Sequence, residues 1–417
     1  MSWFEREPGS AAAAHHLTAF FDAAIAARLA VAIWRQPGQA DVSAIADLSG
    51  AARPSPIHFG LGAPVFTFSP FATDTAHPPL QIHADVRLDN NGLHAQSALW
   101  NGQRQRFETF SAAYQSHLNA PQTPTRWHLP ADAQPVHSAN QADYCRLVHS
   151  AIEFIAASGV KKVVVSRAAT ATLPAAFSPV STLLALCQRY PAAFVSLVAI
   201  PDVGTWIGAS PELLLSTDHR GLHTIALAGT QARTQDAPLA ATRWHAKEIE
   251  EQALVSDYIR DFFQRAGAAT VQETGPHTVA AGNVVHLRTD FHVTLPPAQL
   301  LSLADRVLHE LHPTSAVCGM PKDKALAFIL QHEGYNRSFY SGYLGPMHVD
   351  GETHLYVNLR CMELGRGVAT LYVGGGITAD SDPCAEWRET ELKADTLLAV
   401  LRAQETVHPA RPLAVPA

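Results

Sequence analysis

The chain has 417 residues, of which 47% are hydrophobic and 16% are charged. Such a composition supports a large buried core, in one large domain or in two to three ordinary ones. The formal net charge of −7 argues against a general nucleic-acid-binding surface, although a local basic cleft could still accept a small anion.

The cysteines and the N-terminus indicate the compartment. The five cysteines form no CxxC pair, which argues against a disulfide framework or a zinc knuckle and fits a reducing environment. The sequence has no stretch of about 18 apolar residues. Acidic Glu5 and Glu7 stand where a signal peptide would be basic. We therefore expect a cytoplasmic protein with no membrane and no nucleic-acid partner.

The first 130 residues carry mainly structural signals. Apolar residues at near-helical intervals predict an amphipathic helix over residues 11–32. Between residues 53 and 127, frequent Pro, Gly and Asn separate short apolar runs, which predicts antiparallel strands and loops. We expect residues 1–130 to form an N-terminal layer of the fold, and residues 406–417 to form a loose tail.

Two adjacent lysines follow the first helix beyond this layer. A helix is predicted over residues 143–158, and the strand after it contains Lys161 and Lys162. Because successive side chains of a strand point to opposite faces, one of the two lysines is expected to point inward. A buried lysine is uncommon, so this pair marks a candidate functional position.

The next strands, predicted at 194–200 and 206–209, lead to a turn that contains Glu212. If this carboxyl group is buried, its pKa rises and it can hold a proton near neutral pH. The alternative is a turn glutamate exposed to water. Further along, Gly229 offers a backbone that an anion can approach closely, and Thr230 follows it.

Two acidic pairs stand at the starts of two predicted helices. Glu248 and Glu251 lie in the first turns of a helix over 245–265, and Glu386 and Glu389 lie at the start of the last helix. A spacing of three places each pair on one helix face. Four carboxylates from two helix starts could therefore enclose a divalent cation, and oxygen-only ligands favour Mg²⁺. The alternative is two ordinary solvated helix starts, because Glu is a strong helix former.

The last third of the chain combines helices and strands. Helices are predicted over 297–309 and 322–333, and strands over 283–294, 341–347, 354–362 and 369–373. The first of these strands contains His286. Arg360 is expected inside the strand at 354–362, where an arginine either pairs with an acid or binds a substrate carboxylate.

Short motifs resemble, in order and spacing, those of the chorismate-utilising enzyme family. They are Lys162-Val-Val-Val-Ser-Arg167, Ser210-Pro-Glu212, Ala228-Gly-Thr230, His312-Pro-Thr-Ser-Ala-Val317 and Glu386-Trp-Arg-Glu389-Thr. The resemblance covers residues 140–405, which we expect to form the catalytic core, whereas residues 1–130 match only in general character.

The resemblance implies an α+β fold like that of anthranilate synthase component I. This fold has two intertwined subdomains, with facing antiparallel sheets and outer helices. The implied substrate is chorismate and the implied cofactor is Mg²⁺. Glu251 and Glu389 would be the main metal ligands, with Glu248 and Glu386 holding the ion directly or through water.

The other residues that the resemblance implies would bind the dianionic substrate. Gly229 and Thr230 would lie beside its ring carboxylate, and His286 would line the pocket. The groups that match those with which the family binds the enolpyruvyl carboxylate are Tyr340, Arg360 and the backbone of Gly374, Gly375 and Gly376. Lys393, four residues after Glu389, completes the substrate-binding set.

Lys162 decides the branch of the family. Members that add ammonia resemble one another in having a non-basic residue here, whereas members that add water have lysine. Ala228 stands where members that make aminodeoxychorismate have a lysine, and residues 312–317 resemble the loop of isochorismate synthases. Ser315 and Gln252 depart from that pattern, and Arg288 has no interpretation from the sequence.

The resemblance therefore implies an isochorismate synthase, an isomerase in which water attacks C2 of the ring while the C4 hydroxyl leaves. Lys162 would be the general base for the water, and Glu212 the general acid for the leaving hydroxyl. We expect a monomer without a glutaminase subunit. The alternatives are a salicylate synthase and a non-catalytic chorismate-binding protein. The sequence does not specify whether the product would serve menaquinone, siderophore or salicylate synthesis.

Overall fold

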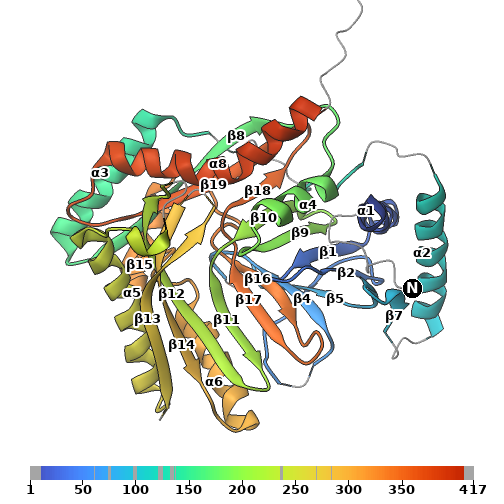
Figure 1. Cartoon of the computed structure of the whole chain (residues 1–417), viewed down its shortest axis with the longest axis horizontal. Helices are drawn as coiled ribbons and strands as arrows, with labels where there is room; N and C mark the ends of the chain where they lie inside the picture. Colours follow the sequence, from blue (N-terminus) through green and yellow to red (C-terminus); the bar gives the residue numbers. More distant parts are fainter. Residues whose placement is uncertain are drawn as a thin grey trace, which may run out of the picture.

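The computed structural model describes residues 11–60, 62–73, 77–96, 101–120, 125–131, 136, 138–234, 238–268, 270–282 and 284–407. Two antiparallel sheets face each other, and helices cover their outer sides (Figure 1). This arrangement is the α+β fold that the sequence predicts. Among the described residues, no helix has the length and apolarity needed to cross a membrane.

The larger sheet, sheet A, has ten strands. Their order is β15 (Gly319–Met320), β8 (Lys162–Thr172), β19 (Val368–Ile377), β18 (Cys361–Leu364), β10 (Gly204–Ser210), β9 (Phe194–Ile200), β1 (Ala30–Arg35), β2 (Val42–Asp47), β6 (Val86–Asp89) and β7 (Gly92–Ala95). The longest ladder joins β8 to β19 and runs from the pair Val163 and Ile377 to the pair Thr172 and Val368.

The second sheet, sheet B, has nine strands. Their order is β13 (Val271–Ala281), β14 (Val284–Val293), β12 (Gly221–Ala232), β11 (Leu213–Asp218), β17 (Thr353–Val357), β16 (Tyr343–Met347), β4 (Val65–Ser69), β5 (Leu80–His83) and β3 (Arg53–Pro54). The ladder between β12 and β14 contains a bulge at Gly229, between Ala228 and Thr230.

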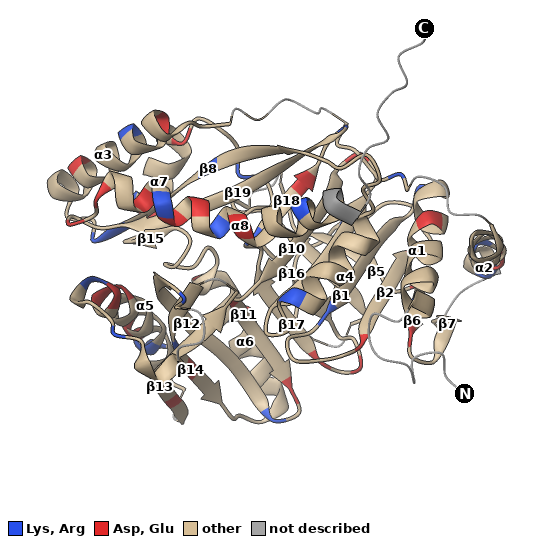
Figure 2. Cartoon of the chain, turned by 45° about the horizontal axis from the view of Figure 1, so that its top comes forward, with Lys and Arg blue, Asp and Glu red and all other residues tan. Residues whose placement is uncertain are grey.

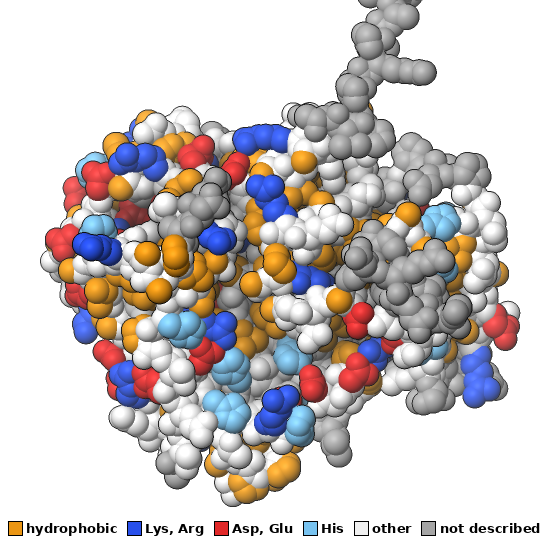
Figure 3. All heavy atoms as spheres, in the orientation of Figure 1, with side chains coloured by type: hydrophobic (Ala, Val, Ile, Leu, Met, Phe, Trp, Pro, Cys, Tyr) orange, Lys and Arg blue, Asp and Glu red, His pale blue; other side chains and the backbone are white. Residues whose placement is uncertain are grey.

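The helices form the outer layers. Those that pack on sheet A, directly or through a neighbouring helix, are α1 (Ala11–Ala26), α2 (Asn101–Asn119), α3 (Gln141–Ser158), α4 (Pro179–Arg189), α7 (Lys322–His332) and α8 (Pro383–Val407). Sheet B carries α5 (Ala246–Arg265) and α6 (Pro297–Leu311), and a short 3₁₀ turn, η1 (Leu239–Ala241), precedes α5. On the face seen in Figure 3, acidic, basic and apolar side chains are interspersed.

The N-terminal strands are built into both sheets. β1 pairs with β9 in sheet A, and β4 pairs with β16 in sheet B. The N-terminal layer therefore extends each sheet rather than packing on one of them. The division into residues 1–130 and 140–405 stays a prediction. α8 reaches Val407, and the rest of the predicted tail, from residue 408, lies outside the described residues.

Two predicted elements of the N-terminal layer are wrong. The helix predicted over residues 11–32 ends at Ala26, and β1 begins at Ala30 after a left-handed turn at Arg28 (φ 52°). A short apolar run that is buried on both faces has no periodicity that separates strand from helix. The strands and loops expected over 53–127 give way to α2 from residue 101, a polar helix that packs on α1.

Arg360 is not inside a strand, in contrast to the prediction. The expected strand over 354–362 is broken into β17, which belongs to sheet B, and β18, which belongs to sheet A. Arg360 lies in the connection with φ 48°, a left-handed conformation that is uncommon for a residue with a Cβ atom. The chain thus crosses from one sheet to the other at this residue.

Aromatic side chains fill the space between the sheets. Phe194 of β9 stacks on Tyr356 of β17 with ring centroids 4.1 Å apart, and Phe68 of β4 stacks on Phe339 at 3.9 Å. These side chains belong to a buried cluster with contributions from both sheets. Their burial holds the sheets in the relative position on which the functional site depends.

Phe194→Ala is expected to lower the free energy of unfolding by about 3–5 kcal/mol, because it removes a fully buried ring from the contact between the sheets. Urea denaturation followed by circular dichroism would measure the change. The matched control is Val368→Ala, since Val368 is 42% exposed, and it should change stability by less than about 0.5 kcal/mol. Equal losses in both variants would contradict this account of the core.

Candidate active site

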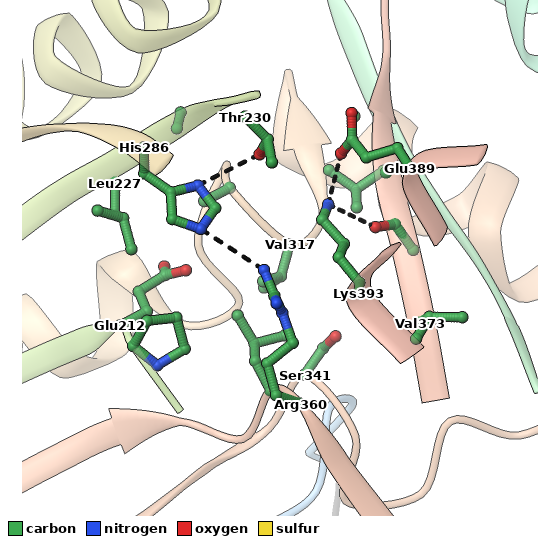
Figure 4. A pocket seen from close by; sticks show the side chains of 18 of the residues that line it. Glu212, Leu227, Thr230, His286, Val317, Ser341, Arg360, Val373, Glu389 and Lys393 are labelled. Atoms are coloured by element: carbon green, nitrogen blue, oxygen red, sulfur yellow. Dashed lines mark hydrogen bonds and ion pairs between the residues drawn. The ribbon is translucent and has the colours of Figure 1, made fainter. Parts of the chain in front are cut away.

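A cavity of about 80 Å³ lies between the two sheets, and its walls bring together most of the predicted site residues (Figure 4). Those that line it are Lys162, Glu212, Thr230, Glu251, His286, Tyr340, Arg360, Gly374, Gly375, Gly376, Glu389 and Lys393. The predicted residues that do not line it are Gly229, Glu248 and Glu386. Residues separated by more than 200 positions in the sequence thus meet in one small polar space.

Lys162, the first residue of β8, is the inward lysine of the pair. It is 1% exposed, whereas Lys161, directly before the strand, is exposed to solvent. The Nζ atom of Lys162 lies 2.7 Å from Oε1 of Glu251 on α5. Burial raises the pKa of Glu251, but Lys162 and neighbouring lysines lower it more, so this carboxyl group is ionised.

Gly376 makes room for this ion pair. A Cβ atom at residue 376 would lie 2.5 Å from Cε of Lys162 and 2.7 Å from Oε1 of Glu251. Real Cβ atoms do not approach other atoms so closely, so a larger residue would displace the pair. The glycine run therefore sits inside β19 because the lysine and the carboxylate pack directly on its backbone.

Glu212 is buried in the turn between β10 of sheet A and β11 of sheet B. Burial raises its pKa to about 7, with Lys162 acting in the opposite direction. Thr314 donates a hydrogen bond to its Oε1 at 3.4 Å. The alternative of a solvent-exposed turn glutamate is wrong, because the residue is only 5% exposed. A carboxyl group with this pKa can donate a proton near neutral pH.

His286 of β14 is buried and neutral. Burial, Arg360 and Lys393 lower its pKa to about 3. Figure 4 shows its ring between Thr230 and Arg360. Nη2 of Arg360 lies 3.5 Å from Nε2, and because the guanidinium group only donates, Nδ1 must carry the ring hydrogen. Nδ1 can then donate to the carbonyl oxygen of Gly229 at 3.2 Å.

Arg360 brings a fixed positive charge into the cavity. Its Nη1 donates to Oγ1 of Thr396 on α8 at 3.1 Å, and no described carboxylate lies within ion-pair distance of it. Burial lowers its pKa from the ordinary value, but an arginine stays charged at any physiological pH. A buried cation without an acidic partner is suited to bind an anionic group of a ligand.

Lys393 of α8 contributes a second cation to the cavity. Its Nζ lies 2.6 Å from Oε1 of Glu389 and 2.8 Å from the carbonyl oxygen of Gly374 (Figure 4). The hydroxyl of Tyr340 lies 3.1 Å from the position that a Cβ atom would take at Gly374. Burial raises the pKa of Tyr340 to about 12, so its hydroxyl group is a donor at neutral pH.

The starts of α5 and α8 lie close together, and Figure 2 shows charged residues along both helices. Glu386 accepts from Lys247 of α5 at 2.7 Å and from Ser381 at 2.8 Å, both at Oε1. Its Oε2 is buried without a hydrogen-bond partner among the described residues. Burial and then Glu389 raise the pKa of Glu386.

The four predicted metal ligands differ in how they are placed. No three of their carboxylate groups lie within 4.8 Å of one another in the described structure. Glu251, Glu386 and Glu389 are each paired with a lysine. Glu248 instead caps α5 by accepting from the backbone N–H of His245 at 3.1 Å.

The residues present nevertheless fit a hard cation. A Cβ atom at Gly375 would lie 2.9 Å from Oε2 of Glu386 and 3.8 Å from Oε1 of Glu389, so the glycine leaves open the space that both carboxylates face. The unpartnered Oε2 atom of Glu386 is a free oxygen ligand in that space. A set made only of carboxylate oxygens suits Mg²⁺ better than a transition metal.

Lys247, which pairs with Glu386 and is attracted by Glu389 and Glu251, was not predicted as a site residue from the sequence. Burial lowers its pKa, but Glu386, Glu389 and Glu251 raise it more, so the ammonium group is charged. The signal in the sequence that could have indicated its role is its position directly before Glu248, at the start of an acidic helix. The spacing of the carboxylates alone did not indicate that a lysine would stand among them.

Comparisons with known proteins identify related enzymes. A family model described as "Chorismate binding enzyme" matches residues 83–402. Isochorismate synthase EntC of Escherichia coli (strain K12) is 31% identical over 266 residues, which cover 62% of this chain and 67% of that protein. The vibriobactin-specific isochorismate synthase of Vibrio cholerae is 28% identical over 67% of this chain and 76% of that protein.

Solved structures with the same fold include two from this group of enzymes. MenF, the menaquinone-specific isochorismate synthase of Escherichia coli, matches with a TM-score of 0.69 and 23% identity over 89% of this chain and 88% of that chain. Anthranilate synthase component I of Streptococcus pneumoniae matches with a TM-score of 0.62 and 20% identity over 88% and 89%. The predicted anthranilate synthase component I-like fold is confirmed.

Glu212→Gln is expected to stabilise the protein at alkaline pH. The folded state, with a Glu212 pKa of about 7 against an ordinary value of 4.5, binds more protons than the unfolded state between these pH values. The free energy of unfolding therefore falls as pH rises through this window, by about 3 kcal/mol in total, and the glutamine variant escapes this loss.

Urea denaturation of both proteins across pH would test this expectation. The variant should be more stable than the wild type at about pH 8.5, and the difference should shrink toward about pH 4.5. A difference that is independent of pH would show that Glu212 has an ordinary pKa in the folded protein.

Proposed function

The chain belongs to the chorismate binding enzymes, and we propose that it is an isochorismate synthase, which converts chorismate to isochorismate. One observation carries this proposal. Lys162, a buried base candidate from sheet A, and Glu212, a buried acid candidate from the turn between β10 and β11, line the same small cavity. A hydroxyl transfer between two ring carbons needs a proton acceptor at one carbon and a proton donor at the other.

The reaction keeps the composition of the substrate. Water adds to C2 and gives one proton to Lys162, while the ring double bond shifts and the C4–O bond breaks. To accept this proton, Lys162 must first release the ammonium proton that it holds in the ion pair with Glu251. Glu212 gives its proton to the departing hydroxyl, which leaves as water. A pKa of about 7 supports this role, since much of the Glu212 carboxyl group is protonated at neutral pH.

Fixed charges hold the substrate for this exchange. Arg360 and the hydroxyl of Tyr340 would bind the enolpyruvyl carboxylate, together with the backbone of Gly374, Gly375 and Gly376, and all of these residues line the cavity. Thr230 and Lys393, which also line the cavity, would hold the ring carboxylate, and neutral His286 forms the wall next to Arg360. Such pre-positioned charges orient the ring and cost no reorganisation during the reaction.

The cofactor that we propose is Mg²⁺. Glu251 and Glu389 would be its main ligands, Glu386 would hold it through the free Oε2 atom, and Glu248 would reach it through water. Bound there, Mg²⁺ would supply positive charge for the ring carboxylate. The five cysteines are free in the structure, which supports a reducing compartment such as the cytoplasm. We further propose that the enzyme acts as a monomer and uses water, so that no ammonia-supplying subunit is required.

Product analysis would test the activity directly. Purified protein is incubated with chorismate, in excess Mg²⁺ or with a chelator, and the products are separated by chromatography. We expect isochorismate with Mg²⁺ and no product with the chelator. Salicylate with pyruvate would favour a salicylate synthase. Anthranilate with ammonia, or chorismate binding without any product, would reject the proposed activity.

Lys162→Ala is expected to lower kcat by roughly 10²–10⁴-fold, the usual contribution of a general base. Lys161→Ala is the matched control, because Lys161 directly precedes β8 and its side chain is exposed to solvent. It should retain wild-type kcat. Circular dichroism would establish that both variants fold. Full activity in both variants would mean that another group activates the water.

A further inference from the structure

A second and much larger cavity, of about 790 Å³, adjoins the catalytic cavity. The two share Pro211, Leu227 and Arg360 as lining residues, so these side chains form the boundary between them. A volume of this size accommodates a small organic molecule. Nothing in the proposed chemistry uses this space.

The walls of the larger cavity include three main parts of the fold. One wall is the connection from α4 to β9, a second is the end of β13 with the turn after it, and a third is α8 at Asp395 and Thr396. Further lining residues follow the end of β12 or lie in η1 and β14. A Cβ atom at Gly282 would lie 2.6 Å from the ring of Tyr190, so the turn packs closely on the first wall. Thr396 accepts from the Tyr190 hydroxyl at its carbonyl oxygen (3.0 Å) and from Arg360 at its Oγ1 atom (3.1 Å).

The lining of the larger cavity is strongly basic. It contains four arginines, Arg189, Arg233, Arg288 and Arg360, and a single acid, Asp395. This local excess of positive charge contrasts with the formal charge of −7 on the whole chain. Positive charge gathered between low-dielectric walls raises the local concentration of small anions.

Several of these charges are not neutralised. Arg189 donates from Nε to the Tyr190 hydroxyl at 3.1 Å and has no carboxylate partner among the described residues. Arg233 is exposed and makes no ion pair with any described residue. Arg288 is held by Asp290 at 3.0 Å, but Asp395 is likewise occupied by Arg402, at 3.0 Å. Guanidinium groups without an acidic partner can bind the carboxylates of a small anion that enters the larger cavity.

We propose that this cavity, the basic vestibule, is the entrance through which a dianionic substrate reaches the catalytic cavity. Arg189 and Arg233 attract the dianion from solution, and Arg360, on the boundary, receives one carboxylate at the inner end. The proposal rests on the proposed function for the identity of the dianion, which is chorismate. It also gives Arg288, which the sequence left without an interpretation, a place in the wall of the entrance.

The first test measures association of chorismate in the Lys162→Ala background, where binding is followed without turnover. Stopped-flow tryptophan fluorescence gives the association and dissociation rate constants. With Arg189→Gln and Arg233→Gln combined, we expect the association rate constant at low salt to fall roughly tenfold. The difference from the parent should vanish as added salt screens the charges.

The matched control is Arg366→Gln, which removes an exposed arginine in the turn between β18 and β19. If the Arg189 and Arg233 variant has the same association rate and salt dependence as this control, the basic vestibule is not the entrance. Because binding alone is measured, this result is separate from the product analysis. A wild type that binds chorismate through the vestibule but forms no isochorismate would contradict only the proposed function.

A second variant distinguishes a route from a binding site. Ala280→Trp narrows the vestibule, since Ala280 lines it. Obstructing a route slows entry and exit by the same factor, so both rate constants should fall while Kd stays unchanged. Ala280→Ser is the control for substitution at this position. A changed Kd with an unchanged association rate would overturn the proposal, because the cavity would then be part of the bound state rather than the path.

Discussion

The ion pair between Lys162 and Glu251 is the constraint on which the site depends. Lys162 comes from β8 of sheet A and Glu251 from α5, which covers sheet B, so their contact at 2.7 Å joins the two halves of the fold. A buried lysine is tolerated only where an anion compensates its charge. The contact in turn requires glycine at residue 376, because any side chain there would occupy the space of the pair. One electrostatic requirement therefore accounts for a lysine, a carboxylate and a glycine far apart in the sequence.

The same principle extends to the whole acidic group. Glu251, Glu386 and Glu389 are opposed by Lys162, Lys247 and Lys393, each at 2.6–2.7 Å. Three acids and three bases neutralise one another, so the group can be buried between two helix starts without a net charge. A cation that binds these carboxylates would compete with the lysine contacts, and two of the lysines, Lys162 and Lys393, line the cavity where a dianion is expected. The charges of the carboxylates, the lysines, the cation and the dianion would therefore balance as a group rather than as separate ion pairs.

Much of this site could be predicted because local rules determine it. Strand alternation predicts that one of the two adjacent lysines points inward, and the motif register selects Lys162. The three-residue spacing places each acidic pair on one helix face, although only Glu251 and Glu389 line the cavity. Burial of Glu212 could not be derived locally, because it depends on residues such as Thr314 that are distant in the sequence. The same holds for β1, where a buried strand follows a helix with no change in apolar character. Lys247 was overlooked because a lysine in an acidic helix start usually lies in solvent.

The position of Arg360 depends on the topology of the two sheets and cannot be predicted from the local sequence pattern. Read as a strand residue, it would point to one face of one sheet, and its partner would be a cross-strand neighbour. In the structure, the chain leaves sheet B after Val357 and enters sheet A at Cys361, so Arg360 stands at the crossing with a left-handed backbone. This conformation costs about 1 kcal/mol or more, and the fold retains it where the two sheets meet. From that crossing, one guanidinium group contacts both His286 of sheet B and Thr396 of α8, and it forms part of the boundary between the catalytic cavity and the basic vestibule.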